Sequence, residues 1–226
     1  NAIDVLSFAS DADGDTLTVT SAAASAGTVT INPDNTLNYV PDPNFNGPVT
    51  ISYTVDDGNG GAASGTLNVT VADVNDIPVA AALSDTVVED GTVAFDVVAS
   101  AADVDGTVDP TLVAIVGASG PGTSHTVAGE GVWSVNATTG VITFTPEPDY
   151  AGPVTDISYT VNDDDGDASV AATLSVSITG QNDAPLAGTP PPQSTNEDMA
   201  LNAIDVLSFA SDADGDTLTV TSAAAS

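Results

Sequence analysis

The sequence predicts an all-β fold made of tandem Greek-key β-sandwich domains in an elongated array. Three observations predict it: apolar residues alternate with polar ones along short segments, turn-forming residues separate these segments, and the sequence repeats internally. Alternation with a period of two is the pattern of half-buried strands. Several short strands in domains of roughly 100 residues favour a sandwich over a large barrel.

The alternating segments follow one another along the chain. Threonine, valine and serine fill them, as a pleated surface favours, and turn residues such as Asn32-Pro33-Asp34-Asn35 separate them. No stretch keeps a helical period. The residues expected on one face of each strand are Leu17/Val19, Val29/Ile31, Leu37/Tyr39, Ile51/Tyr53/Val55, Leu67/Val69/Val71, Phe95/Val97, Trp133/Val135, Ile142/Phe144, Ile157/Tyr159/Val161 and Leu174/Val176/Ile178.

The sequence contains one long identical repeat. Residues 1–25 and residues 202–226 have the same sequence, so the period is 202 − 1 = 201 residues. Such identity predicts a parent protein with nearly identical units in series. A segment duplicated by design would give the same identity.

A weaker repeat divides each long unit into two related domains. The sequence Gly-Pro-Val-Thr at 47–50 recurs at 152–155, and Ile-Ser-Tyr-Thr-Val at 51–55 recurs at 157–161. We therefore expect residues 1–76 to form a sandwich that lacks its first strand and residues 77–183 to form a complete one. Residues 184–226 are expected to be the N-terminal portion of the next repeat, with 184–201 representing the first strand that 1–76 lacks.

The charge of the chain excludes several classes of partner. There are 32 acidic residues, one histidine and no lysine or arginine, which gives a formal net charge of −32. Without cations the chain cannot neutralise phosphates, so we expect no nucleic-acid binding and no attraction to anionic lipids. No apolar run approaches the roughly 18 residues that span a bilayer, so no direct membrane insertion is expected. The absence of cysteine excludes disulfides and thiolate metal sites.

Acidic residues gather in the turns, as in Asp11-Ala12-Asp13-Gly14-Asp15 and Asp73-Val74-Asn75-Asp76. Ca²⁺ prefers six to eight oxygen ligands from carboxylates and carbonyls, whereas Mg²⁺ takes fewer protein ligands. The turns therefore predict Ca²⁺ sites. The alternative is that they are solvated turn residues without a metal. An EF-hand is excluded because Thr16 and Ala22 occupy the positions that need glycine and glutamate.

These motifs resemble those of a known family. Ala9-Ser10-Asp11-Ala12-Asp13 resembles the cadherin Ala-x-Asp-Ala-Asp signature, and Asp73-Val74-Asn75-Asp76-Ile77-Pro78 resembles the cadherin interdomain linker. Glu89 and Glu197 fall where cadherins place a glutamate on the first strand. Together with Asn44-Phe45-Asn46-Gly47, the set is similar to the cadherin-like tandem repeats of giant bacterial surface adhesins, which are calcium-binding extender domains with a cadherin/immunoglobulin-like sandwich.

The resemblance implies one group of metal ligands at each domain junction. One departure is that Gly180-Gln181 replaces Asp73-Val74 in the second linker, and another is that Pro146-Glu147-Pro148-Asp149 replaces an acidic segment of cadherins. The implied ligands are Asp73, Asn75, Asp76, Asp103, Asp105 and Asp163 at the first junction, Glu89, Asn182, Asp183, Asp212 and Asp214 at the second, Asp11, Asp13 and Asp57 toward a preceding domain, and Glu197 in the final repeat.

The function that the resemblance implies is that of a non-catalytic, extracellular repeat on a bacterial cell surface, stiffened by Ca²⁺ and supporting cell adhesion or biofilm. Its expected partners are neighbouring repeats, including head-to-tail fibres formed by strand addition, and an unknown surface or glycan ligand. The alternative is a Ca²⁺-dependent, lectin-like carbohydrate-binding module. An enzyme is not expected, because the single histidine, His125, lies in a glycine-rich stretch without a nucleophile motif.

Overall fold

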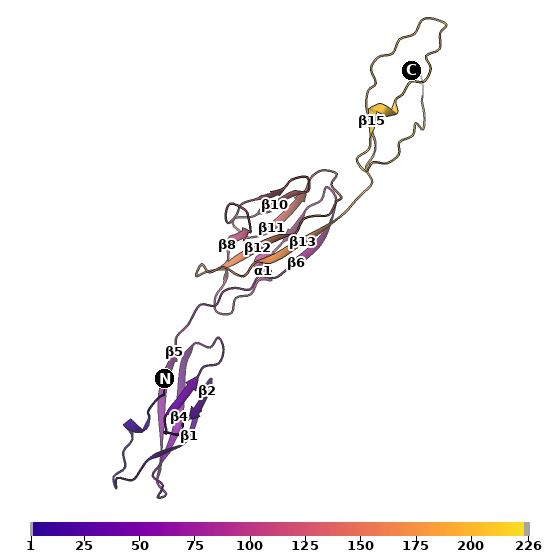
Figure 1. The fold of residues 1–226 in the computed structure, drawn as a ribbon. Helices are drawn as coiled ribbons and strands as arrows, with labels where there is room; N and C mark the ends of the chain where they lie inside the picture. Colours follow the sequence, from indigo (N-terminus) through magenta and orange to yellow (C-terminus); the bar gives the residue numbers. More distant parts are fainter. Residues whose placement is uncertain (1, 224–226) are drawn as a thin grey trace. The chain divides into compact units, whose positions relative to one another are not determined.

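The computed structural model describes residues 2–223 of the chain, and its strands confirm the all-β prediction (Figure 1). The chain divides into two compact units, Asn1–Asp76 (unit 1) and Ile77–Ser226 (unit 2). Each unit has its own hydrophobic core. No helix among the described residues is long and apolar enough to cross a membrane.

Unit 1 consists of a three-stranded sheet and a two-stranded hairpin. The sheet has the order β1-β4-β5, and the hairpin pairs β2 with β3, all antiparallel. An isolated β-bridge joins Ile3 to Leu37 of β3. The buried core residues are Val5, Val19, Leu37, Val49, Ile51 and Val55. The elements are η1 (Leu6–Phe8), β1 (Thr18–Ala24), β2 (Thr28–Ile31), β3 (Leu37–Val40), β4 (Gly47–Asp56) and β5 (Ala62–Val71).

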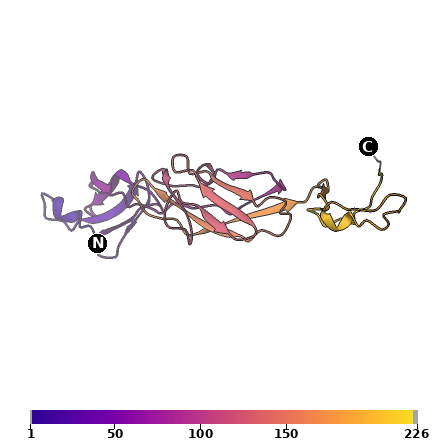
Figure 2. The same cartoon turned by 90° about the horizontal axis from the view of Figure 1, so that it is seen from above.

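Unit 2 contains a sandwich of two four-stranded sheets with the orders β7-β11-β10-β9 and β6-β13-β12-β8. Strand β6 pairs with β13 in parallel, while the other ladders are antiparallel. Figure 2 shows the same ribbon turned by 90°, with the strands of this unit drawn as magenta to orange arrows. The elements are β6 (Leu83–Val88), β7 (Val93–Phe95), α1 (Val97–Ser100), β8 (Val108–Ile115), β9 (His125–Val127), β10 (Gly131–Val135), β11 (Ile142–Pro146), β12 (Ile157–Asp163) and β13 (Ala172–Thr179).

Aromatic residues fill the core of this sandwich. Trp133 is fully buried, with its ring centroid 4.7 Å from that of Phe144 and 6.2 Å from that of Phe95. Tyr159 is also fully buried, and its hydroxyl donates a hydrogen bond of 2.5 Å to the carbonyl of Ala81. The aromatic side chains bury large apolar surfaces, so they anchor the packing of the two sheets.

Residues 184–223 carry little regular structure. They contain β14 (Leu186–Ala187), η2 (Leu207–Phe209) and β15 (Ala210–Ser211), and β14 pairs with β15. This pairing repeats the bridge between Val79 and Ala102 in the sandwich, one domain earlier in the chain. Many apolar side chains of the segment are exposed, among them Ile204, Val206 and Val220.

The structure corrects several details of the strand prediction. Val97 begins the single-turn helix α1, although its side chain is fully buried as expected. The turn forms because the Asp96 carboxylate accepts a hydrogen bond from the Ala99 amide at 2.9 Å and so caps it. His125 follows the glycine-rich stretch, which favours a loop, but it begins strand β9 and is paired opposite Trp133.

Candidate metal centres

The turn that follows η1 folds around the carboxylate of Asp11. Its Oδ1 accepts hydrogen bonds from the amides of Asp13 at 2.8 Å and Asp15 at 3.1 Å. Gly14 supplies a positive φ of 82° within the turn. Aspartate is favoured here because its short side chain can bond to amides two to four residues later and fix the turn. The arrangement also holds the carboxylates of the turn in defined places.

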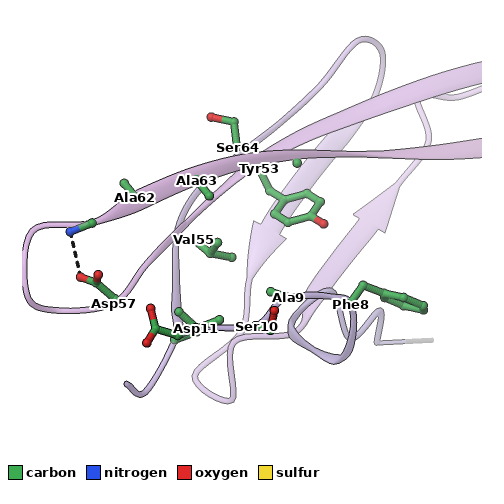
Figure 3. Close-up of a pocket in the computed structure, with 13 residues that line it drawn as sticks. Phe8, Ala9, Ser10, Asp11, Tyr53, Val55, Asp57, Ala62, Ala63 and Ser64 are labelled. Carbon is green, nitrogen blue, oxygen red and sulfur yellow. Dashed lines mark hydrogen bonds between the residues drawn. The ribbon is translucent and has the colours of Figure 1, made fainter. Parts of the chain in front are cut away.

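The β4–β5 loop brings Asp57 to the same region of unit 1. Asp57 Oδ1 accepts hydrogen bonds from the amides of Asn59 and Gly61, at 2.7 and 2.9 Å, and these bonds lower the pKa of the Asp57 carboxyl. Figure 3 shows the bond to Gly61 and the carboxylates of Asp11 and Asp57 facing the same space. One carboxylate oxygen each of Asp11, Asp15 and Asp57 lies within 4.8 Å of the others. We name this group the Asp11 cluster.

Unit 2 repeats this local structure in its own sandwich. Asp103 Oδ1 accepts from the Gly106 amide at 3.2 Å, and Asp163 Oδ1 accepts from the Asp167 amide at 2.7 Å. Asp163 is fully buried, and the Oδ2 atom of Asp103 is buried without a hydrogen-bond partner. A buried polar atom of this kind requires an explanation, such as a bound ion.

A second acidic group lies within unit 2, where Glu89 follows β6, Asp183 lies beyond β13, and Asp214 follows β15. One carboxylate oxygen of each lies within 4.8 Å of the others. Glu89 is buried and accepts a hydrogen bond from the Gln181 amide, and Asp214 Oδ2 accepts from the Asp183 amide at 2.6 Å. We name this group the Glu89 cluster.

The Glu89 cluster is electrostatically strained. Burial raises the pKa of the Asp183 carboxyl, and the negative charges of Asp149, Asp214, Glu89 and Asp90 raise it further. Asp183 Oδ2 is buried without a hydrogen-bond partner. The chain has no lysine or arginine that could neutralise the group. An unpartnered carboxylate oxygen among hard oxygen donors fits a divalent cation such as Ca²⁺.

The structure brings only some of the predicted ligands together. Asp11 and Asp57 join one cluster, and Glu89, Asp183 and Asp214 join the other. The other predicted carboxylate ligands do not belong to either group. Asp13 and Glu197 are exposed, Asp73 accepts from Asn46 Nδ2 at 2.5 Å, Asn182 donates to the Asp183 carbonyl at 2.9 Å, and Asp212 Oδ1 accepts from the Asp216 amide at 3.1 Å. Asp73, Asn75 and Asp76 belong to unit 1 and Asp103, Asp105 and Asp163 to unit 2, and a shared role for them stays a prediction.

Two residues near the clusters were not among the predicted ligands. Asp15 completes the Asp11 cluster, and its Oδ2 accepts a hydrogen bond of 2.8 Å from Asn59 Nδ2. Asp149 lines a hollow with Asp183 and Asp212. A signal for Asp149 was present in the sequence: Pro146-Glu147-Pro148-Asp149 stands where cadherins carry an acidic segment, and the structure shows that its aspartate lies beside the linker.

Fold and acidic turns together define a β-sandwich repeat with acidic clusters that can hold cations. Residues 1–72 match the model of the cadherin-like domain, and residues 75–180 match that of the bacterial cadherin-like domain. The chain belongs to the cadherin-like family. Domains of this family are typical of non-catalytic, extracellular adhesion repeats and generally bind Ca²⁺. A search of curated protein sequences gives no match.

One solved structure supports the fold, and two others are similar at lower scores. Human CDH23 EC21-23 is 19% identical with a TM-score of 0.50, covering 87% of this chain and 68% of that one. Protocadherin gamma B2 extracellular domains 1–5 are 20% identical with a TM-score of 0.44, covering 77% of this chain and 35% of that one. The chain thus spans about a third of that ectodomain. An endo-fucoidan hydrolase of glycoside hydrolase family 107 is 18% identical, covers 75% of this chain and 24% of that one, and has a TM-score of only 0.30, too low for an argument about activity.

Proposed function

We propose that the chain is an extender repeat of a bacterial surface adhesin, stiffened by Ca²⁺ and supporting cell adhesion or biofilm formation. The observation that carries this proposal is the Glu89 cluster. Its carboxylates come from the end of a sandwich strand, from the linker after that sandwich, and from the acidic turn of the next repeat. A cation bound by all three ties the linker to both sides.

The physical effect of Ca²⁺ follows from mass action. A cation that binds the ordered cluster stabilises it by an amount that rises with the logarithm of free Ca²⁺ over Kd. Extracellular modules have Kd values of about 10⁻⁴–10⁻³ M, which match Ca²⁺ outside cells. The repeat is therefore stiff outside the cell and slack where Ca²⁺ is scarce, with neighbouring repeats as its first partners.

The test is small-angle scattering combined with thermal unfolding, with Ca²⁺ and then with excess chelator. We expect chelation to make the particle more flexible and to lower the Tm of unit 2. The doubly substituted variant Glu89→Gln, Asp183→Asn should lose most of this response. Asp156→Asn is the matched control because Asp156 is exposed and lies outside both clusters. If chelation left the scattering and the Tm of the parent chain unchanged, the clusters would be solvated turns without a bound cation.

A Ca²⁺-dependent carbohydrate-binding role is the second candidate. The Asp11 cluster borders a hollow of about 410 Å³ that is also lined by Phe8 and Tyr53 (Figure 3). Phe8 is 88% exposed, so its ring is available to a ligand that enters this hollow. A glycan array with and without Ca²⁺ tests it. Ca²⁺-dependent binding that Asp57→Asn abolishes would favour the lectin; an array without binding would favour the extender.

The proposed function also includes assembly of repeats by strand addition. In unit 2 strand β6 covers one edge of β13, whereas the corresponding edge of β5 in unit 1 carries no strand among the described residues. An unpaired edge can template pairing with another chain. The segment 184–201 is the candidate strand, and head-to-tail addition of such strands gives a fibre.

A further inference from the structure

The C-terminal copy of the repeated segment is exposed where the N-terminal copy is buried. Val5 is 3% exposed in unit 1, whereas Val206, its identical counterpart, is 40% exposed. Val19 is 6% exposed, whereas Val220 is 54% exposed. Identical side chains have identical packing requirements, so the surface that buries Val5 and Val19 in unit 1 also fits Val206 and Val220.

The hollow of unit 1 is a space that a further segment of chain would fill. It is lined by Phe8–Asp11, by the start of β5 and by Tyr53. Tyr53 corresponds to Tyr159 of unit 2, where the hydroxyl bonds to the carbonyl of Ala81. In unit 2 the equivalent space is therefore occupied by the residues that precede β6. The Val79–Ala102 bridge corresponds to the Leu186–Ser211 pair, because Ala102 and Ser211 directly precede Asp103 and Asp212 of the same motif. The counterparts of Ala80–Ala82, which precede β6, are therefore 187–189.

Aligning Glu197-Asp198 with Glu89-Asp90, which directly follow β6, gives the register of a strand on the β5 edge. Strand β6 pairs in parallel with β13, with Ser177 opposite Thr86. The counterparts of these residues are Thr70 in β5 and Ser194 in the C-terminal segment. Pro191 and Pro192 have no amide hydrogen, so they cannot both belong to a ladder, and we expect pairing over 193–196. An edge strand is also the place where proline is tolerated.

We propose that residues 187–222 of one copy of this chain replace residues 1–21 in unit 1 of a second copy and complete that sandwich. The donor brings its own pairing of Leu186–Ala187 with Ala210–Ser211 unbroken, which simple addition of 187–196 to an intact unit 1 would have to break. Exchange restores every contact of the displaced segment, fills the hollow and covers the β5 edge. Exchange of an identical element is a low-cost route to association, and because donor and acceptor surfaces differ it continues head to tail.

This inference deepens the assembly part of the proposed function, and its test requires no response to Ca²⁺. The matched pair Val5→Asp and Val206→Asp places one substitution in two identical sequences. Under exchange, the parent chain associates as its concentration rises, as measured by light scattering after size exclusion. Val206→Asp should remain monomeric, because its donor segment no longer fits. Val5→Asp should associate at a concentration at least roughly tenfold lower than the parent chain does. The reason is that its own residues 1–21 compete poorly with the donor segment for the surface of unit 1.

Cross-linking gives an independent readout of the register. The chain has no cysteine, so introduced thiols are its only ones. Ser194→Cys with Thr70→Cys should give covalent dimers and ladders with a short thiol cross-linker, whereas Ser194→Cys with Thr66→Cys should give few. Exchange would be overturned if the parent chain stayed monomeric, or if the cross-link formed only within single chains at all concentrations. It would also be overturned if Val5→Asp abolished association and Val206→Asp left it unchanged. This last result would support simple strand addition.

Discussion

Asp183 is partly buried beside other carboxylates, and both the desolvation of its carboxyl and their negative charges raise its pKa. Without Ca²⁺, a raised pKa in the folded state means that the ionised form lowers stability at neutral pH. We therefore expect Asp183→Asn to raise the Tm in chelator at about pH 7, above the ordinary Asp value of about 3.9. In Ca²⁺ the same substitution should lower the Tm, because a ligand is lost.

The pH dependence of this effect has a definite sign. As the pH falls through the raised folded-state pKa of Asp183, the carboxyl takes up a proton and the penalty disappears. The advantage of Asp183→Asn in chelator should thus shrink on acidification and vanish below the unfolded-state pKa. Thermal unfolding of both proteins across this range measures it. If Asp183→Asn were less stable than the parent chain in chelator at neutral pH, this would contradict the view that the ionised Asp183 carboxylate destabilises the folded state.

Ser169 shows what one hydroxyl contributes inside the sandwich. It is 6% exposed, and its Oγ accepts a hydrogen bond of 3.1 Å from the amide of Val161, which is fully buried. Ser169→Ala leaves that buried amide without this acceptor, which costs about 1–3 kcal/mol of unfolding free energy. Urea unfolding measures the loss. Ser177→Ala, on an exposed position of β13, should change stability by less than about 0.5 kcal/mol.

At the scale of single elements, the β10–β11 turn depends on a glycine for two separable reasons. Gly140 has a φ of +71°, and a Cβ there would lie 2.6 Å from Val98 Cγ2 and 2.8 Å from Val113 Cγ2. Gly129 has a similar φ of +79° but open space around it. Gly129→Ala should cost only the left-handed backbone penalty of about 1–2 kcal/mol. Gly140→Ala adds overpacking of about 1–3 kcal/mol.

Chemical unfolding of the two alanine variants separates these contributions. Equal losses for both would mean that the neighbours of Gly140 move aside without cost, and that only the backbone conformation matters. A larger loss at Gly140 would show that the turn packs against the helix α1 and the strand β8. The latter result is expected because Val113 is fully buried and has little room to move.

The strands that the sequence predicted are those with strict alternation on a half-buried face. Trp133 with Val135 and Tyr159 with Val161 are examples, and they lie in β10 and β12. Strand β8 escaped prediction because Pro110 interrupts it, which an edge strand of the sheet tolerates. Helix α1 is a single turn, too short to give a helical period. Its cause is the local bond from Ala99 to Asp96, which periodicity does not report.

The metal-site predictions depended on position in a repeated motif, and this determined what they could reveal. Motif position pointed to Glu89, Asp183 and Asp214, which are far apart in sequence and lie together in the structure. It did not single out Asp15, because the role of this residue depends on the β4–β5 loop folding back and on the bond from Asn59. Long-range proximity of this kind is set by tertiary packing, which no local pattern contains.

At the scale of the whole molecule, the two units should unfold separately. The core of unit 1 has no fully buried aromatic residue among those described, whereas unit 2 buries Trp133, Phe144 and Tyr159 completely. A smaller apolar core gives a less stable domain. Trp133 is the single tryptophan of the chain, so its fluorescence reports unit 2 alone. At low concentration, far-UV circular dichroism should therefore show a first transition that tryptophan fluorescence does not, separated by at least about 5 °C.

Protein concentration then distinguishes an isolated unit 1 from one completed by a neighbour. If residues 187–222 of another copy occupy unit 1, mass action raises its Tm with concentration, while the tryptophan transition stays in place. Val206→Asp should remove this dependence without moving the tryptophan transition, because Val206 is exposed and lies outside the buried core of the sandwich. Coincident transitions at every concentration would show instead that the two units unfold as one cooperative body, with the edge of β5 already protected.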